Sequence, residues 1–286
     1  MDELQYIPKP REQWDYLPPR KGDPNWRSYN VPASGWYLIQ PCEYINEFGL
    51  RGALTKKSKR MLCVGCSVTA GLFLPEPETL SWSIESRLHD WTVLNCGAAN
   101  FGTYCHLLRL DLYKQIAPQF VVFQVMQPIR NPSLYFTERE FERECDLELM
   151  SATSFNQYEL NHRFTKAARK ALYLYEDIRD TSSYLADKVF DRAVRKDIRY
   201  MQRFFTALKI PYLVHLNVQH YPFYKKKHID WLRDNFENVL VYDIPVTIDY
   251  CREEGDDHPN GRRNNLISEH ITRFMRENFR HLDFSL

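Results

Sequence analysis

The sequence predicts an α/β/α sandwich built around a five-stranded parallel sheet. From Arg60 onward, short apolar runs rich in β-branched and aromatic residues alternate with amphipathic stretches. Such alternation is typical of a parallel, doubly wound sheet, and we expect the strand order 2-1-3-4-5 of flavodoxin-like folds. The first run ends at Gly65 and leads into Ser67 and other small residues, which is how such folds present a side chain at the carboxyl edge of the sheet.

Each predicted element follows from its own pattern of apolar residues. The predicted strands are Met61–Gly65, Thr92–Cys96, Phe120–Met126, Tyr212–Asn217 and Val239–Asp243. The predicted helices carry apolar residues on one face, as Leu80, Ile84 and Leu88 do at a four-residue step in the first of them. These helices are Glu78–Asp90, Thr103–Ile116, Asp187–Leu208, Lys227–Asn235 and Arg262–Phe279.

Two stretches do not fit the alternation. Residues 1–58 are rich in proline and show no long helical period, so we expect an N-terminal extended arm packed on the core domain, residues 59–286. Residues 130–185 are an irregular insertion that follows the third strand, and we expect them to cap the site and select the substrate. The arm should pack through its aromatic residues, among them Trp14, Tyr16, Trp26, Tyr29 and Trp36.

Charge and composition narrow the possible functions. Lys and Arg total 38 against 37 for Asp and Glu, which argues against nucleic acid as the main partner. No apolar run reaches the roughly 18 residues that span a bilayer, and the acidic start at Met1–Leu4 does not resemble a secretory leader. The 7 cysteines form no regular framework, so we expect a cytoplasmic protein with free thiols.

The sequence gives no support for a metal or a cofactor. Cys63 and Cys66 form a C-x-x-C spacing, but redox pairs of this kind usually open a helix and Cys63 lies in a predicted strand, so small buried apolar side chains are favoured. The remaining histidines, including His215 and His220, are expected to be packing or surface residues. No H-E-x-x-H pattern, close Cys/His cluster or G-x-G-x-x-G after the first strand is present.

Ser67 and His258 are the residues that point to catalysis. A serine hydroxyl is a poor nucleophile until a base accepts its proton, and His258 is the best candidate base in the chain. It follows Asp256 and Asp257 and precedes Pro259, which keeps the local backbone from becoming helical. A neighbouring carboxylate would fix the tautomer of the imidazole and stabilise its charged form. Without Ser67, His258 would be interpreted as a surface-loop histidine.

Gly97 follows the second predicted strand and has two interpretations. A glycine at that edge allows close approach of the backbone to a ligand, and its N–H could point at a developing oxyanion. Alternatively, the turn from strand to helix needs glycine for steric reasons alone. The two interpretations are compatible, and the sequence does not choose between them.

Three short segments resemble the motif blocks of the SGNH, or GDSL-type, hydrolases. They occur in the family's order at the ends of predicted strands, and the resemblance spans about residues 46–275, including a lead-in at Asn46–Gly52. It implies the SGNH hydrolase fold, which is flavodoxin-like, and an enzyme that cleaves or transfers acyl esters, often acetyl groups on carbohydrates, lipids or small metabolites. The matching segments are Gly65–Thr69, Asn95–Gly97 with Phe101–Gly102, and Asp256–Asn260.

The resemblance also implies roles for individual residues. Ser67 would be the nucleophile, His258 the base and Asp256 the residue that orients it, while the N–H groups of Ser67 and Gly97 would donate to the oxyanion. The family's acid usually stands three residues before the histidine, where this chain has Gly255. Asp256 fits the D-x-H spacing of some members, and Asp257 is the alternative.

The third block of the family departs most in this chain. It supplies an asparagine side chain to the oxyanion hole, and Gln127 stands nearest that position here, with Arg130 and Asn131 as possible substitutes. Loss of one such donor costs about 2.7–4 kcal/mol of transition-state stabilisation. That loss would slow the reaction without abolishing the fold.

The sequence is therefore compatible with three functions. The first is a serine esterase that acts on a small-molecule or carbohydrate ester. The second is an acyltransferase with the same site, in which an alcohol or amine replaces water; exclusion of water by the cap would decide between them. The third is a catalytically weak binding protein that keeps the fold. The acyl group, the alcohol part and the oligomeric state stay open.

Overall fold

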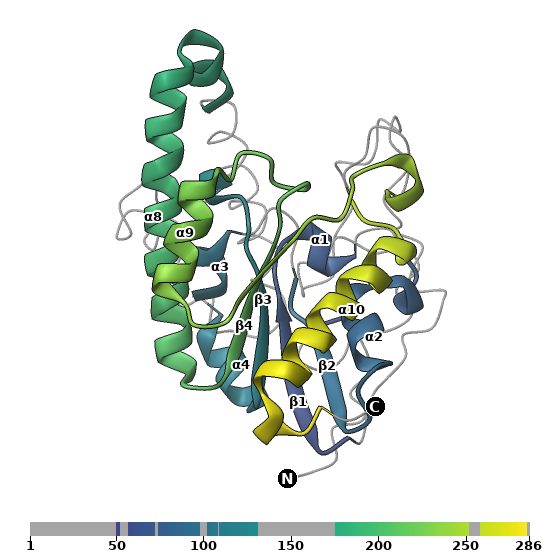
Figure 1. The fold of residues 1–286 in the computed structure, drawn as a ribbon. Helices are drawn as coiled ribbons and strands as arrows, with labels where there is room; N and C mark the ends of the chain where they lie inside the picture. Colours follow the sequence, from purple (N-terminus) through teal and green to yellow (C-terminus); the bar gives the residue numbers. More distant parts are fainter. Residues whose placement is uncertain are drawn as a thin grey trace, which may run out of the picture.

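A five-stranded parallel sheet forms the centre of the protein (Figure 1). The computed structural model describes residues 50–51, 57–71, 74–97, 102–107, 109–130, 175–251 and 258–284. Its strands lie in the order β2-β1-β3-β4-β5, and each neighbouring pair is parallel, which confirms the predicted fold class and strand order. The strands are β1 Lys59–Val64, β2 Trp91–Asn95, β3 Phe120–Gln124, β4 Tyr212–Asn217 and β5 Val239–Tyr242.

Helices cover both faces of this sheet (Figure 1). One face carries α3 Thr103–Leu107, α4 Leu110–Ile116, α8 Ser183–Leu208 and α9 Lys226–Asn235, and the other carries α2 Leu80–Glu85 and α10 Gly261–Asn278. The single-turn helix α1, Ser67–Ala70, stands at the carboxyl edge. Short 3-10 turns are η2 Glu76–Glu78, η3 Pro128–Arg130, η5 Ile248–Tyr250 and η6 Arg280–Leu282. None of the described helices combines the length and hydropathy that a membrane crossing requires.

Alternation along the strands divides the core into two layers. In β1, Leu62 and Val64 join the cluster under α3, α4, α8 and α9, whereas Met61 and Cys63 join the cluster under α2 and α10. All four side chains are fully buried. A strand buried on both faces reads as a continuous apolar run, which is why short apolar runs rich in β-branched and aromatic residues identified these strands.

Two predicted helices differ from the observed ones. The predicted helix Glu78–Asp90 is α-helical only over α2, because the N–H groups of Arg87 and Leu88 bond to carbonyls three residues back and tighten the chain into a turn. The predicted helix Thr103–Ile116 divides into α3 and α4. The break lies at Arg109, whose φ of −100° and ψ of 10° leave the helical range.

The predicted arm and cap lie mostly outside the described residues, including the arm aromatics expected to pack on the core. Of the arm, Leu50 and Arg51 are described and fully buried. The end of the predicted cap is not irregular, because residues 175–181 are helical and α8 begins at Ser183. Ser182 caps α8 by accepting a hydrogen bond from the N–H of Leu185, which explains why the helix starts before the predicted Asp187.

Candidate active site

Ser67 is the first residue of α1, directly after the turn that leaves β1. Its side chain is buried, at 7% exposure. Gly65 has no room for a side chain, since a Cβ atom there would lie 2.5 Å from Gln124 Oε1 and closer still to Thr69 Oγ1. The run of small residues therefore lets the turn pack tightly under α1 while the Ser67 hydroxyl stays at the carboxyl edge of the sheet.

His258 lies next to Ser67 although 191 residues separate them in the chain. The Nε2 atom of His258 is 2.9 Å from the Oγ atom of Ser67. This is the distance at which a base can take a proton from a nucleophile. For Nε2 to act as the acceptor, the ring hydrogen of the neutral imidazole must be on Nδ1.

Backbone pairing and a helix cap fix the position of His258. Pro259 pairs with Cys251 in an isolated antiparallel bridge, which closes the loop that leads to the histidine. Asn260 caps α10, with its Oδ1 atom accepting from the N–H of Arg263 at 3.0 Å. Its Nδ2 atom donates to two backbone carbonyls of the segment around η5, at 2.9 and 3.1 Å. The imidazole is thus held between a closed loop and the start of α10.

Several predicted site residues lie outside the described residues. Asp256 and Asp257 fall in the segment 252–257, and Asn131 follows η3. Arg130 is the last residue of η3, but only its backbone belongs to the described part. The choice of orienting acid and the roles of Arg130 and Asn131 therefore stay as predicted from the sequence.

Gly97 is sterically required and its N–H is engaged. A Cβ atom at Gly97 would lie 2.7 Å from the carbonyl carbon of Thr69 and nearer to the backbone nitrogen of Ala70, so the turn after β2 contacts α1 directly. The Gly97 N–H donates to Asn95 Oδ1 at 3.1 Å. A role as oxyanion donor requires this hydrogen bond to be shared with the substrate or exchanged for it.

Gln127 is half-buried in the segment between β3 and η3. Its Oε1 atom is buried and makes no hydrogen bond to another described residue. Leaving a buried amide oxygen without a partner is costly, and a catalytic role is one explanation for such a group. The position agrees with a side chain available to a ligand, but its predicted role toward the oxyanion stays a proposal.

Gln124 supports the nucleophile turn and was not singled out in the sequence. Its Oε1 atom accepts a hydrogen bond from Thr69 Oγ1 at 2.6 Å and lies 3.6 Å from the thiol of Cys66. A polar residue at the end of the otherwise apolar run Phe120–Gln124 was the available signal, because the last strand residue meets the loops at the carboxyl edge.

His106 supports the same turn from α3. Its Nε2 atom lies 3.0 Å from the carbonyl oxygen of Gly65, and its Nδ1 atom lies 2.7 Å from the hydroxyl of Tyr113. Burial lowers the pKa of His106 to about 3, and the nearby Arg109 cation acts in the same direction. The ring is therefore neutral, donates from Nε2 to Gly65 and accepts from Tyr113. No sequence pattern indicated this role, because it depends on tertiary contact.

His215, Cys63 and Cys66 pack in the interior. His215 is buried, its Nδ1 atom lies 2.9 Å from the Tyr242 hydroxyl, and burial lowers its pKa to about 3. Cys63 and Cys66 are both free thiols and belong to core clusters on opposite faces of the sheet, which confirms the apolar interpretation over a redox pair. Within the described ranges, no three His, Cys, Asp or Glu side chains gather as ligands for a metal ion.

Comparisons with known proteins place this geometry in context. No family model and no curated protein matches the sequence. Among solved structures, the chain is similar to a lipolytic protein of the G-D-S-L family from Veillonella parvula, at 12% identity over 76% of this chain and 97% of that one, with a TM-score of 0.39. It is also similar to a lipase/acylhydrolase from Enterococcus faecalis, at 14% identity over 77% and 96% of the two chains, with a TM-score of 0.38.

An acetyl xylan esterase from the rumen bacterium Butyrivibrio proteoclasticus is similar at 8% identity, over 82% of this chain and 68% of that one, with a TM-score of 0.44. Members of the G-D-S-L family are thus among the solved structures that this chain resembles.

Proposed function

We propose that this protein is a serine hydrolase of the SGNH type, which cleaves an acyl ester through an acyl-enzyme on Ser67. The observation that carries the proposal is the 2.9 Å distance from His258 Nε2 to Ser67 Oγ at the carboxyl edge of the sheet. A nucleophile and a base at this distance are the minimum that nucleophilic catalysis of acyl transfer requires. The motif resemblance suggests an acetyl ester of a carbohydrate or small metabolite as the substrate class.

Acylation takes place in two steps, and both use the side chains of Ser67 and His258. His258 Nε2 takes the proton from Ser67 Oγ while Oγ bonds to the ester carbonyl carbon, whose π electrons move onto oxygen. When the tetrahedral intermediate collapses, the bond from carbon to the alcohol oxygen breaks and His258 returns the proton to that oxygen. Water repeats the two steps on the acyl-enzyme, so one ester and one water give one acid and one alcohol.

The remaining roles follow the motif resemblance. Asp256, or Asp257 in its place, would hold the hydrogen of His258 Nδ1 and so keep Nε2 free to accept a proton. The N–H groups of Ser67 and Gly97 and the amide of Gln127 would donate to the oxyanion. Close contact between the Gly97 turn and α1 supports the pairing of the two N–H groups, because it brings the two segments together.

A fluorophosphonate probe tests the proposal directly. Incubation followed by intact-mass measurement should show one adduct per chain, and peptide mapping should locate it on Ser67. The matched control is Ser67→Ala, which should take up no probe. Absence of an adduct on the wild type, together with no hydrolysis of p-nitrophenyl acetate above the Ser67→Ala background, would refute the hydrolase. Added alcohols and amines in the same assay separate acyl transfer from hydrolysis.

A further inference from the structure

We propose that Arg51 is a positioning residue for catalysis, which sets the geometry between Ser67 and His258 through a hydrogen-bond network around η2. We call Arg51, Glu76 and the carbonyls of Ala70, Gly71 and Leu74 the Arg51 brace. The inference rests on the proposed function, since it assigns a further residue to the same site. It concerns a residue of the lead-in Asn46–Gly52, which precedes the motif of Ser67 in the sequence.

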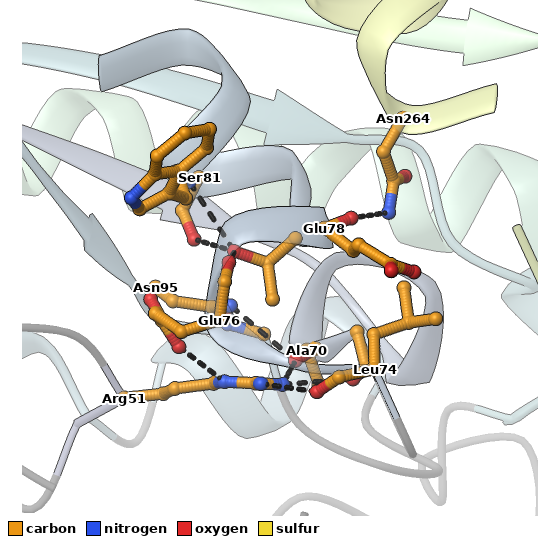
Figure 2. Close-up of polar contacts among 12 residues, drawn as sticks. Arg51, Ala70, Leu74, Glu76, Glu78, Ser81, Asn95 and Asn264 are labelled. Carbon is orange, nitrogen blue, oxygen red and sulfur yellow. Dashed lines mark hydrogen bonds and ion pairs between the residues drawn. The ribbon is translucent and has the colours of Figure 1, made fainter. Parts of the chain in front are cut away.

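Arg51 is fully buried, and its guanidinium lies at the carboxyl end of α1 (Figure 2). Its Nη1 atom donates to the carbonyl oxygens of Ala70 at 2.9 Å and Gly71 at 2.8 Å, and its Nη2 atom donates to that of Leu74 at 2.5 Å. Its Nε atom donates to Glu76 Oε2 at 2.6 Å, so the buried charge has a carboxylate partner. One side chain therefore binds the carbonyl of Ala70 at the end of α1 and two carbonyls of the segment that follows it.

The brace reaches Ser67 through a single helical turn. The N–H of Gly71 donates to the carbonyl of Ser67 at 3.1 Å, and the carbonyl of Gly71 accepts from Arg51. Ala70 and Ser67 are three residues apart, or about 4.5 Å along the axis. Because α1 has only 4 residues, movement of its last carbonyls also moves its first residue.

The same network reaches the turn that carries Gly97. Asn95 Nδ2 donates to the Ala70 carbonyl at 3.4 Å, and Asn95 Oδ1 accepts from the N–H of Gly97 at 3.1 Å. Arg51 also pairs with Asn95 in an isolated antiparallel bridge. The Ala70 carbonyl is thus shared by Arg51 and by the residue that orients the Gly97 N–H.

On its other side, η2 holds the start of α10, which follows His258. Asn264 Nδ2 donates to the carbonyl of Glu78 at 2.8 Å, as Figure 2 shows. A Cβ atom at Gly261 would lie 2.7 Å from Glu78 Cγ, so the first turn of α10 packs directly on η2. Glu76 binds the nucleophile side through Arg51, while Glu78, two residues later, holds the histidine side. The relative position of the two catalytic segments therefore depends on this turn.

The chemistry of the brace requires a guanidinium. Its planar fork donates in several fixed directions at once, whereas a lysine ammonium is a single point at the end of a flexible stem. Arg51→Lys keeps the charge but cannot reach three carbonyls and a carboxylate in the same geometry. Glu76→Gln keeps an acceptor oxygen for Arg51 Nε and removes only the negative charge, so it is the milder test.

The experiment compares Arg51→Lys with Arg276→Lys. Arg276 also donates to two backbone carbonyls, those of Phe284 at 3.0 Å and Arg87 at 2.9 Å, but it lies near the end of α10 remote from His258. With p-nitrophenyl acetate below the melting temperature of each variant, Arg51→Lys should lower kcat by about 10- to 100-fold, because small misplacements of catalytic groups have effects of this size. KM should not change, and Arg276→Lys should leave kcat unchanged. Glu76→Gln should lower kcat in the same direction by a smaller factor.

A purely structural Arg51 would give a different result. If Arg51→Lys and Glu76→Gln lower the melting temperature but keep the wild-type kcat, the proposal is wrong. Should Arg51→Lys not fold, the kcat of Glu76→Gln decides. If the wild type neither hydrolyses esters nor takes up the probe, the proposed function has failed. Amide hydrogen exchange of residues 67–71 then tests whether the Arg51 brace holds α1 in place. Faster exchange in Glu76→Gln than in Arg276→Lys would support this role of the brace, and equal exchange in the two variants would overturn it.

Discussion

The turn that carries Ser67 and the loop that carries His258 are held in place by different means. Side chains from several elements converge on the serine turn: His106 from α3, Gln124 from β3, and Arg51 from the segment before β1. Two of these side chains are less than 1% exposed and the third is 5% exposed, so the supports belong to the core.

Among the described residues, the segment that carries His258 is held by one backbone bridge and by the side chain of Asn260. The Cys251–Pro259 bridge closes it, and Asn260 joins it to the first turn of α10. The position of Ser67 is therefore set by the packed sheet, whereas the position of His258 is set by the start of α10. Changes on either side should therefore lower activity, but changes on the serine side should cost more stability than changes on the histidine side.

The largest expected effect comes from removing either member of the pair itself. Ser67→Ala and His258→Ala should each lower turnover of an activated ester by about 10³-fold or more, since the groups of such a site act as a unit. The double variant should be no slower than the single ones. Steady-state rates with p-nitrophenyl acetate measure this, and additive losses would show that the two side chains act independently.

The next effect concerns the acid that orients the base. Asp256→Asn should lower kcat less than His258→Ala does, because its role is orientation, and Asp257→Asn should change little. The two variants are matched in charge and in sequence position. If Asp257→Asn proves the slower enzyme, Asp257 is the orienting acid and the hydrolase mechanism stands with that reassignment.

Gly65→Ala tests the serine side of the comparison. The added methyl group collides with Thr69 Oγ1 and Gln124 Oε1, so we expect a loss of about 1–3 kcal/mol of unfolding free energy, the usual cost of overpacking. Activity should fall as well, because the same atoms hold the turn. Urea unfolding and ester hydrolysis measured on one preparation check both predictions. If Gly65→Ala keeps the wild-type stability and activity, the turn accommodates the added methyl group without cost.

The sequence predicted what local pattern determines and missed what tertiary contact determines. The strand Tyr212–Asn217 was predicted with its observed bounds because apolar runs buried on both faces carry a strong signal. Ser67 and His258 were recognisable because their neighbours form short motifs at strand and helix ends. His106 gave no such signal, and Arg51 was recognised only as part of the lead-in Asn46–Gly52, since their roles depend on carbonyls 41 and about 20 residues away.

Acid should weaken the fold through His106. Its pKa is near 3 in the folded protein against an ordinary 6.5, because burial favours the neutral ring. Stability is complete above pH 6.5 and should fall as the pH drops toward 3, by up to about 1.4 kcal/mol per pH unit. His106→Gln retains an amide donor for the Gly65 carbonyl and removes the titration. Its unfolding free energy should therefore depend less on pH than that of the wild type, and an equal dependence would contradict the assignment.

The smallest effect should fall on the histidine side, where Asn260→Ala removes the cap of α10. Loss of an N-cap costs about 1 kcal/mol. Ser182→Ala, which removes the cap of α8, is the matched control, because both side chains accept from an N–H three residues on. The two variants should lose similar stability in urea, but only Asn260→Ala should lower kcat, since Asn260 also ties the loop of His258 through two backbone carbonyls. Equal kcat values would mean that the side chain of Asn260 does not position the imidazole.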